Sequence, residues 1–118
     1  MTTTVLRYKQ PISDDGPDLK KGEALGGLEV NTCNLASASQ PEQVSVAPWS
    51  LEWSDGTTTK DVWSGVVSAE YPYNLKTLKP GRCVKGWIVF TVPVKGKPSV
   101  AVYEGQSNEG QPAEWKLS

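Results

Sequence analysis

Two lone cysteines and the absence of histidine decide most of the chemistry open to this chain. Cys33 and Cys83 are the only cysteines among 118 residues, neither belongs to a CxxC pair, and no histidine occurs. The usual zinc sites and the hydrolases of Ser/His/Asp or Cys/His type are therefore excluded. The pair predicts either a disulfide, as in small extracellular β domains, or two reduced thiols that serve as small core residues in a cytosolic protein.

The carboxylates offer no better prospect of catalysis or metal binding. Asp14, Asp15 and Asp18 lie in one loop, but the segment DDGPD lacks the alternating ligand spacing of an EF-hand, so we interpret it as a solvated turn. A Ser-Lys or paired-carboxylate enzyme would need a cleft of which the sequence gives no sign. We therefore expect no enzyme activity, no catalytic residue, no cofactor and no bound metal.

The aromatic residues are the remaining lead to a binding site. Trp63, Tyr71 and Tyr73 fall in the irregular segment DVWSGVVSAEYPYN, and the loops of a sandwich can present such side chains to a protein partner or a sugar ring. We take these three as the candidate binding surface, with packing against the end of the sandwich as the alternative. Three tryptophans lie at positions of the predicted strands where the period-two alternation places apolar, packed side chains, so we expect them in the core: Trp49, Trp53 and Trp87.

An all-β fold must position these residues. Apolar and polar residues alternate with period two along nearly the whole chain, and no stretch keeps helical spacing beyond one or two turns. The expected strands span residues 4–10, 25–35, 43–47, 49–53, 83–93, 99–105 and 113–118. Shorter strands are expected at 57–60, closing a hairpin on Asp55-Gly56, and near 65–68. We interpret Gly26-Gly27 as a bend or bulge before a strand.

The number and spacing of the strands predict the architecture. Seven or eight short strands in a chain of this length are typical of an immunoglobulin-like two-sheet antiparallel β-sandwich, with a small β-barrel as the alternative. At 118 residues, 37% of them hydrophobic, we expect a single domain over residues 1–118. Segment 83–93 is apolar on both faces, so it is expected in the centre of a sheet. The predicted core face carries Ile88, Phe90 and Val92, and the other face Trp87 and Val89.

Charge and hydropathy exclude two classes of partner. The formal net charge is −1 and the 12 Lys and Arg residues are scattered, so no surface for nucleic acid or an anionic membrane is expected. No apolar run approaches the roughly 20 residues of a membrane span, and no basic and apolar leader follows Met1. A secreted domain without its leader or lipid anchor would look the same, so these observations leave the compartment open.

The order Cys33, Trp49, Cys83 imitates antibody-type domains, in which a tryptophan packs on an inter-sheet disulfide. The imitation is incomplete, because Gly81 stands where the tyrosine corner would place its tyrosine. Pro80 and Gly81 instead make Cys83 the first residue after a turn. Any bridge is therefore expected near one end of the sandwich.

The segment LKTLKPGRCVKGWIVFTVPVKGKPSVAVY carries a closer resemblance. Its pattern is a leucine, a Pro-Gly turn, a glycine before a strand that ends in Phe-x-x-Pro, and a closing strand after a Lys-Pro turn. The matching positions are Leu78, Pro80, Gly81, Gly86, Phe90, Pro93, Lys97, Pro98 and Tyr103. Together with EVNTCNLAS and WSLEWSDGT upstream, about residues 25–105 resemble a bacterial extracellular immunoglobulin-like family of uncharacterised function. The family occurs in secreted proteins and lipoproteins and carries the misleading name telomeric repeat-binding factor 2.

The resemblance implies a fold and a location. The family has no established catalytic residues to carry over, and its name lends no support to DNA binding. The cysteine pair resembles that of members from Gram-positive secreted proteins and lipoproteins, which implies an extracellular or cell-envelope-associated domain.

Three functions are then open. The leading expectation is a non-catalytic extracellular domain that acts through protein contacts or adhesion, with an unknown protein or cell-surface partner. The alternative is a carbohydrate-binding module that uses the loop aromatics, and the second alternative is a cytosolic or phage-encoded structural protein.

Overall fold

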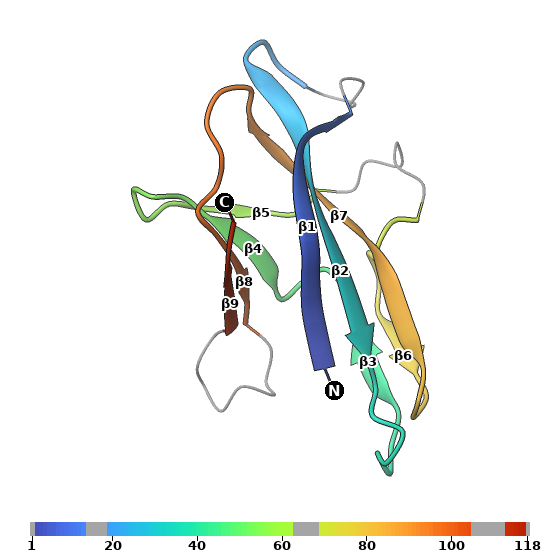
Figure 1. Ribbon diagram of the computed structural model, residues 1–118. Coiled ribbons are helices and arrows are strands. Elements are labelled where there is room, and N and C mark those ends of the chain that lie inside the picture. Colours follow the sequence, from blue (N-terminus) through green and yellow to red (C-terminus); the bar gives the residue numbers. More distant parts are fainter. Residues whose placement is uncertain (1, 14–18, 63–68, 105–112, 118) are drawn as a thin grey trace.

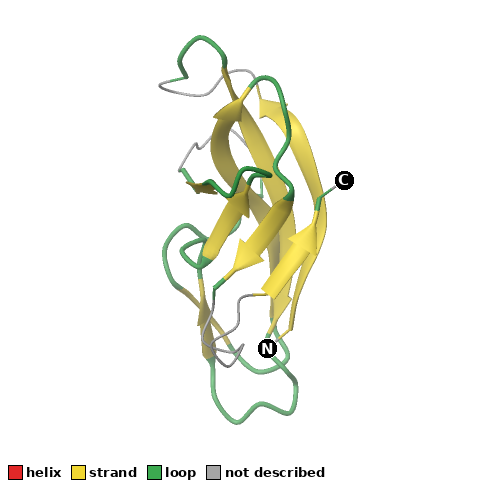
Figure 2. Ribbon diagram, turned by 90° about the vertical axis from the view of Figure 1, so that its left-hand side faces the viewer, coloured by secondary structure: helices red, strands yellow, loops and turns green. Residues whose placement is uncertain are grey.

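Two antiparallel sheets form the two layers of the molecule. The computed structural model describes residues 2–13, 19–62, 69–104 and 113–117. The first sheet has the order β1-β2-β7, formed by β1 (Thr2–Ser13), β2 (Glu23–Cys33) and β7 (Cys83–Pro93). The second has the order β5-β4-β8-β9, formed by β5 (Thr58–Lys60), β4 (Trp49–Glu52), β8 (Val100–Tyr103) and β9 (Ala113–Lys116). Figures 1 and 2 show the two layers from views a quarter-turn apart.

A separate two-stranded ladder lies at one end of the sandwich. It pairs β3 (Glu42–Val44) with β6 (Lys76–Leu78), at the end where β2 finishes and β7 begins (Figure 1). β6 was not expected from the sequence, because its three residues carry one inward apolar side chain, that of Leu78. This ladder and the loops around it form the candidate site described below.

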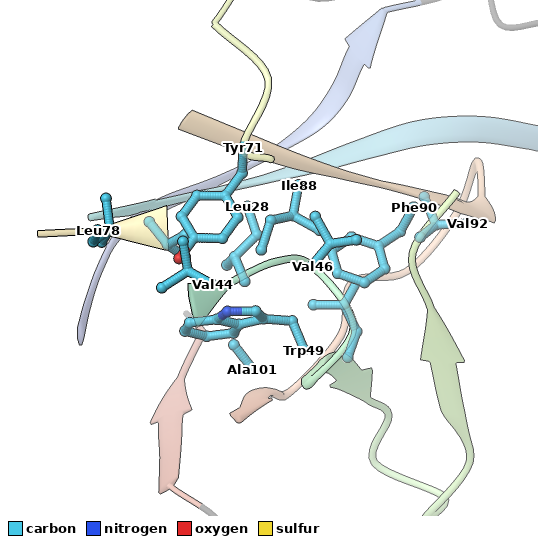
Figure 3. Close-up of a cluster of buried hydrophobic side chains, with 12 residues drawn as sticks. Leu28, Val44, Val46, Trp49, Tyr71, Leu78, Ile88, Phe90, Val92 and Ala101 are labelled. Carbon is cyan, nitrogen blue, oxygen red and sulfur yellow. The ribbon is translucent and has the colours of Figure 1, made fainter. Parts of the chain in front are cut away.

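The core lies between the two sheets because each strand alternates inward apolar and outward polar side chains. The central cluster contains Leu28 and Val30 of β2, Ile88, Phe90 and Val92 of β7, Trp49 and Leu51 of β4, and Ala101 of β8. Figure 3 shows Ile88 and Phe90 on one side of this cluster and Trp49 and Ala101 on the other. The expectation that Ile88, Phe90 and Val92 fill the core is confirmed, and the architecture is a sandwich rather than a barrel.

β7 is an outer strand of the sheet β1-β2-β7, so the expectation that segment 83–93 lies in the centre of a sheet is wrong. Short segments nevertheless bridge its second edge. On one edge it pairs with β2 without interruption, from Glu23↔Pro93 to Cys33↔Cys83. On the other edge, Asp61 bridges Phe90 and Glu70 bridges Trp87. On the outer face, the Arg7 guanidinium lies 5.0 Å from the centre of the Trp87 ring and bonds the Glu29 carboxylate at 3.1 Å, which covers part of the indole.

Gly26 and Gly27 are not a bend or bulge, and that interpretation is wrong. Both lie inside β2 in unbroken register with β7. A Cβ atom on Gly26 would collide with the Tyr8 hydroxyl, and one on Gly27 with Ile12 and Trp87. The two glycines are therefore required by side chains that cross β2 closely on its two faces.

The other predicted strands within the described residues are present, but they begin or end at different residues than predicted. The hairpin on Asp55-Gly56 is confirmed: β4 pairs with β5, Gly56 has a φ of 89°, and the Trp53 indole donates to Thr59 Oγ1 at 2.9 Å across the pair. The first strand runs further than predicted, as β1 (Thr2–Ser13). The predicted strand at 65–68 lies outside the described residues. No helix in the described part of the chain is long and apolar enough to cross a membrane.

Candidate functional site

The structure separates the three aromatic residues proposed as a binding surface. Trp63 lies outside the described residues. Tyr73 has 47% of its surface exposed and remains available for contacts, whereas Tyr71 is 2% exposed. The prediction that Tyr71 is presented on the surface is therefore wrong, and packing, the alternative that we kept open, describes it.

Tyr71 is buried because its backbone runs beside β7 and its side chain turns into the core. The Tyr71 amide donates to the Trp87 carbonyl at 2.9 Å, and the Trp87 amide donates to the Ala69 carbonyl at 3.0 Å. The close approach depends on Gly86, where a Cβ atom would meet the Tyr71 nitrogen at 2.5 Å. The Tyr71 hydroxyl then donates to Thr32 Oγ1 at 2.7 Å inside the protein, which satisfies its one polar group.

A cleft of about 210 Å³ opens between Tyr71 and Tyr103, and we name it the Tyr71–Tyr103 cleft. It brings together four parts of the chain: the end of β2, β3 with the loop after it, the segment 71–75, and the end of β8. Its walls comprise Thr32, Gln43, Val44, Ser45, Ala47, Pro48, Tyr71, Leu75 and Tyr103. The walls are mostly apolar and carry no charged side chain. At this size, below the roughly 300–1,000 Å³ of small-molecule sites, the cleft suits a single apolar group.

Aromatic packing supports the Tyr103 wall of the cleft. The rings of Trp49 and Tyr103 lie with centroids 5.1 Å apart, and Trp49 and Trp115 at 5.2 Å, which are favourable tilted contacts. The Trp49 indole N–H is buried and has no hydrogen-bond partner in the part of the chain that the structure describes. Trp49 thus contributes to this wall through the contacts of its ring.

The tyrosines of the cleft are not suited to acid–base chemistry near neutral pH. Burial raises the pKa of Tyr71 above its ordinary value, although the bond to Thr32 opposes this. Burial also raises the pKa of Tyr103, and the negative charge of Glu42 adds to the effect. Both phenols stay neutral, so the cleft offers ring faces and hydroxyl groups.

A second hollow, of about 370 Å³, lies between β1 and β9, which are edge strands of the two different sheets. Val5 and Tyr8 come from β1 and Trp115 and Leu117 from the last residues of the chain. The edge of β1 is irregular at Leu6, where the register with β2 shifts between Val5 and Arg7, and such bulges hinder the addition of further strands.

The disulfide is formed, and it lies where the turn at Pro80-Gly81 placed it. Cys33 and Cys83 are bonded and form the last pair of the β2–β7 ladder, so the prediction of a bridge near one end of the sandwich is confirmed. The bond joins neighbouring strands of one sheet, unlike the inter-sheet bond of antibody domains. Just beyond it, the buried Asn34 side chain donates to the carbonyl groups of Gln40 and Leu78 at 3.1 and 3.0 Å, which holds β6 against this end.

No metal centre is found among the described residues, where no group of three or more His, Cys, Asp or Glu side chains could hold an ion. Asp14, Asp15 and Asp18 lie in segment 14–18, outside the described residues.

Leu75 and Tyr103 are the residues of the site that sequence reasoning missed. Leu75 is 67% exposed, and the signal was present, since it is an isolated apolar residue in the polar run YNLKT. Tyr103 had the parity of an inward residue in SVAVYEG. Neither pattern indicates that the two side chains lie in the same cleft, because that depends on the packing of β8 against the ladder.

Comparison with known proteins supports the fold class. No protein-family model and no curated protein matches the sequence, so membership of the family that the motifs resemble stays a prediction. Two solved structures are similar over almost the whole chain. The yjhA protein from Bacillus subtilis has a TM-score of 0.72 and 17% identity, with 98% of this chain and 90% of that chain covered. The secreted protein MPT63 from Mycobacterium tuberculosis has a TM-score of 0.70 and 13% identity, with coverages of 97% and 80%. At these identities the likeness establishes the fold alone: an all-β, immunoglobulin-like antiparallel sandwich found in bacterial proteins.

Proposed function

We propose that this chain is a non-catalytic extracellular domain of a bacterial secreted protein or lipoprotein, and that it acts through protein–protein contacts or adhesion. The observation that carries the location is the Cys33–Cys83 disulfide, because such bonds form and persist outside the reducing cytosol. The fold likeness to a secreted mycobacterial protein supports the same location.

The nature of the exposed residues favours contacts with protein. Tyr73 and Leu75 are both exposed, and Leu75 lines a cleft whose walls are mostly apolar and carry no charged side chain. Apolar anchors around a small pocket are typical of protein interfaces. The carbohydrate alternative used three aromatic side chains, of which Tyr71 is buried in the core, so protein contact is the better supported reading.

The thiol state of the native protein tests the location. The chain is isolated from its source cells, free thiols are alkylated at once, and the mass is measured with and without prior reduction. We expect no alkylated cysteine before reduction and two after it. Two free thiols in the freshly isolated protein would overturn the extracellular assignment and favour the cytosolic or phage-encoded alternative.

A glycan array tests the mode of action. We expect that the wild-type chain binds no glycan whose binding is weakened by Tyr73→Ala. A glycan bound by the wild-type chain and lost on Tyr73→Ala, with the fold intact by circular dichroism, would overturn the protein-contact proposal and establish the carbohydrate-binding alternative.

A further inference from the structure

The two halves of the Cys33–Cys83 bond differ in exposure. Cys33 lies in β2, the middle strand of its sheet, between Thr2 of β1 and Cys83 of β7, and it is half-buried. Cys83 is exposed at the start of β7, an outer strand. The two bridges on the open edge of β7 lie further along the strand, at Trp87 and Phe90. A thiol from solution therefore reaches the bond from the Cys83 side.

The sulfur of Cys33 has a hydrogen-bond donor beside it. The side-chain amide of Asn31 donates to Cys33 Sγ at 3.5 Å. A disulfide sulfur is a weak acceptor, but a thiolate carries a negative charge and accepts such a bond more strongly. Lys85 stands opposite Asn31 in the β2–β7 ladder, so its side chain lies on the same face of the sheet as the bond, and a nearby positive charge favours thiolates. These surroundings stabilise Cys33 as the sulfur that leaves when the bond is attacked.

The two strands are held together on both sides of the bond by contacts other than the bond itself. On one side the ladder continues through Thr32↔Val84. On the other side the Asn34 amide donates to the Arg82 carbonyl at 2.9 Å, and the Gly81 amide donates to the Asn34 carbonyl at 3.1 Å. Opening the Sγ–Sγ bond therefore leaves the two cysteines facing each other, and the high effective concentration of one thiol beside the other favours re-formation of the bond.

We infer that Cys33–Cys83 is a redox-active disulfide, which low-molecular-weight thiols open and close in the folded protein. In the first step a thiolate, R–S⁻, attacks Cys83 Sγ. The R–S–Sγ bond forms, and the electron pair of the Sγ–Sγ bond leaves with Cys33 Sγ, which is held by the Asn31 amide and takes up a proton from solvent.

A second thiolate completes the reduction. It attacks the R sulfur of the mixed disulfide on Cys83, so that R–S–S–R is released and Cys83 leaves as a thiolate, which is protonated in its turn. Two external thiols are thereby oxidised to one disulfide, and the protein disulfide is reduced to two thiols. Oxidation of the reduced chain by R–S–S–R runs through the same steps in reverse.

The rate of reduction of the folded chain by glutathione tests the inference. The oxidised protein is incubated with excess glutathione, exchange is stopped with acid, and the products are identified by mass. We expect the rate to change less than about twofold over the first molar of urea, below the unfolding transition, because the attack does not require unfolding. A bond reached only after global unfolding would react about tenfold faster or more, because urea raises the unfolded population exponentially.

The reduced chain provides a second measurement. We expect it to keep its β-sheet circular dichroism spectrum and, after transfer to glutathione disulfide, to recover the mass of the oxidised chain. Two single variants then identify the reactive sulfur. The Cys83 thiol of Cys33→Ser should form a mixed disulfide with glutathione severalfold faster than the Cys33 thiol of Cys83→Ser, because Cys83 is the exposed residue of the pair.

The role of Asn31 has its own test. Asn31→Ala should slow the reduction of the folded chain severalfold, because the leaving Cys33 thiolate loses its donor. The direction separates this role from a structural one, since a less stable fold would expose the bond more often and speed its reduction. The matched control is Thr4→Ala, which shortens an exposed, neutral side chain opposite Asn31 in β1 and should leave the rate unchanged.

The inference is overturned by a reduction rate that follows the unfolded population in urea, by a reduced chain that loses its sheet structure, or by faster modification of Cys33 than of Cys83. Reduction of Asn31→Ala as fast as the wild type also contradicts the mechanism stated above. The inference goes beyond the proposed function and does not depend on the partner that the domain contacts. A bond that opens only on unfolding would still be present in the freshly isolated protein, so the proposed location would stand.

Discussion

Cys33 and Cys83 face each other directly at the end of the β2–β7 ladder, with 4.0 Å between their Cα atoms. The bond closes a loop with a sequence separation of 50 residues, for which the chain-entropy model gives about 4 kcal/mol. Because β2 and β7 are already paired along their whole length, we expect the double variant Cys33→Ser/Cys83→Ser to fold but to lose about 2–4 kcal/mol in its free energy of unfolding. Urea denaturation measures this loss. The reduced wild type should match the double variant, and an unchanged unfolding midpoint would contradict the prediction.

Gly86 is expected to control whether the segment before Tyr71 can lie on β7. A Cβ atom there would meet the Ala69 carbonyl oxygen at 2.6 Å and the Tyr71 nitrogen at 2.5 Å, so the backbone of residues 69–71 must move. We expect Gly86→Ala to destabilise the fold by about 1–3 kcal/mol and to remove hydrogen-exchange protection from the Tyr71 and Trp87 amides. The control is Gly22→Ala, where φ is 88° but no atom lies within 4 Å. It should lower stability through backbone strain alone and leave these two amides protected. Equal protection in both variants would refute this role of Gly86.

The bond between Tyr71 and Thr32 should be measurable as a coupling energy. The Tyr71 hydroxyl donates to Thr32 Oγ1, which also lies 3.2 Å from Thr3 Oγ1. We expect Tyr71→Phe to cost about 1 kcal/mol in free energy of unfolding, because a buried hydrogen bond is lost while the ring remains. A double-mutant cycle with Thr32→Val should give a coupling of about 0.5–1.5 kcal/mol. Additive single effects would mean that the bond does not contribute to stability.

The parts of the fold that were predicted are those whose signals are local. Segment 83–93 is apolar on both faces, follows the Pro80-Gly81 turn and ends at Pro93, and the observed β7 has the same bounds. The hairpin was predictable because its turn residues, Asp55 and Gly56, are adjacent in the sequence. The disulfide was predictable because Cys33 and Cys83 are the only cysteines and each has only one possible partner within the chain. In these cases the side-chain pattern and the turn residues are sufficient to determine the structure.

The candidate site was mostly not predictable, because its parts come together through distant contacts. Tyr71 looked like a loop aromatic, and its burial depends on a glycine fifteen positions later in the chain that admits its backbone to the edge of β7. The cleft combines Thr32, Val44, Leu75 and Tyr103, which belong to separate segments with no common motif. β6 is too short to show any alternation. The sequence therefore indicated aromatic residues in the correct region, but it left open whether Tyr71 is exposed or packed, and it missed Leu75.

Stability should fall at alkaline pH because three tyrosines are held neutral by the fold. Burial raises the pKa of Tyr8, Tyr71 and Tyr103 above the ordinary value of 10.0. As the pH rises, the unfolded chain therefore loses these protons before the folded chain does. The contribution of the three neutral tyrosines to the free energy of unfolding is complete below about pH 10, and it is lost as the pH rises towards the folded-state pKa values. We expect the unfolding midpoint in urea to drop above pH 10, and to drop less steeply in Tyr8→Phe. A difference between wild type and Tyr8→Phe that is constant from pH 8 to pH 11 would contradict this account.

Leu6 is expected to protect the exposed edge of β1. Val5 pairs with Val30 and Arg7 with Glu29, so Leu6 is the extra residue of a bulge, and 46% of its surface is exposed. Deletion of Leu6 would keep Val5 inward and Arg7 outward but would make the edge regular from Thr2 to Lys9, up to the second register shift between Lys9 and Ser13. This stretch would then present a continuous row of unpaired backbone groups. We therefore expect the deletion to increase aggregation, followed by light scattering and thioflavin fluorescence, although it removes an exposed apolar side chain. The control, Leu6→Ala, removes the same side chain and keeps the bulge, and it should aggregate no faster than the wild type. If the alanine variant aggregated as fast as the deletion, the loss of the side chain and not the shape of the edge would be responsible.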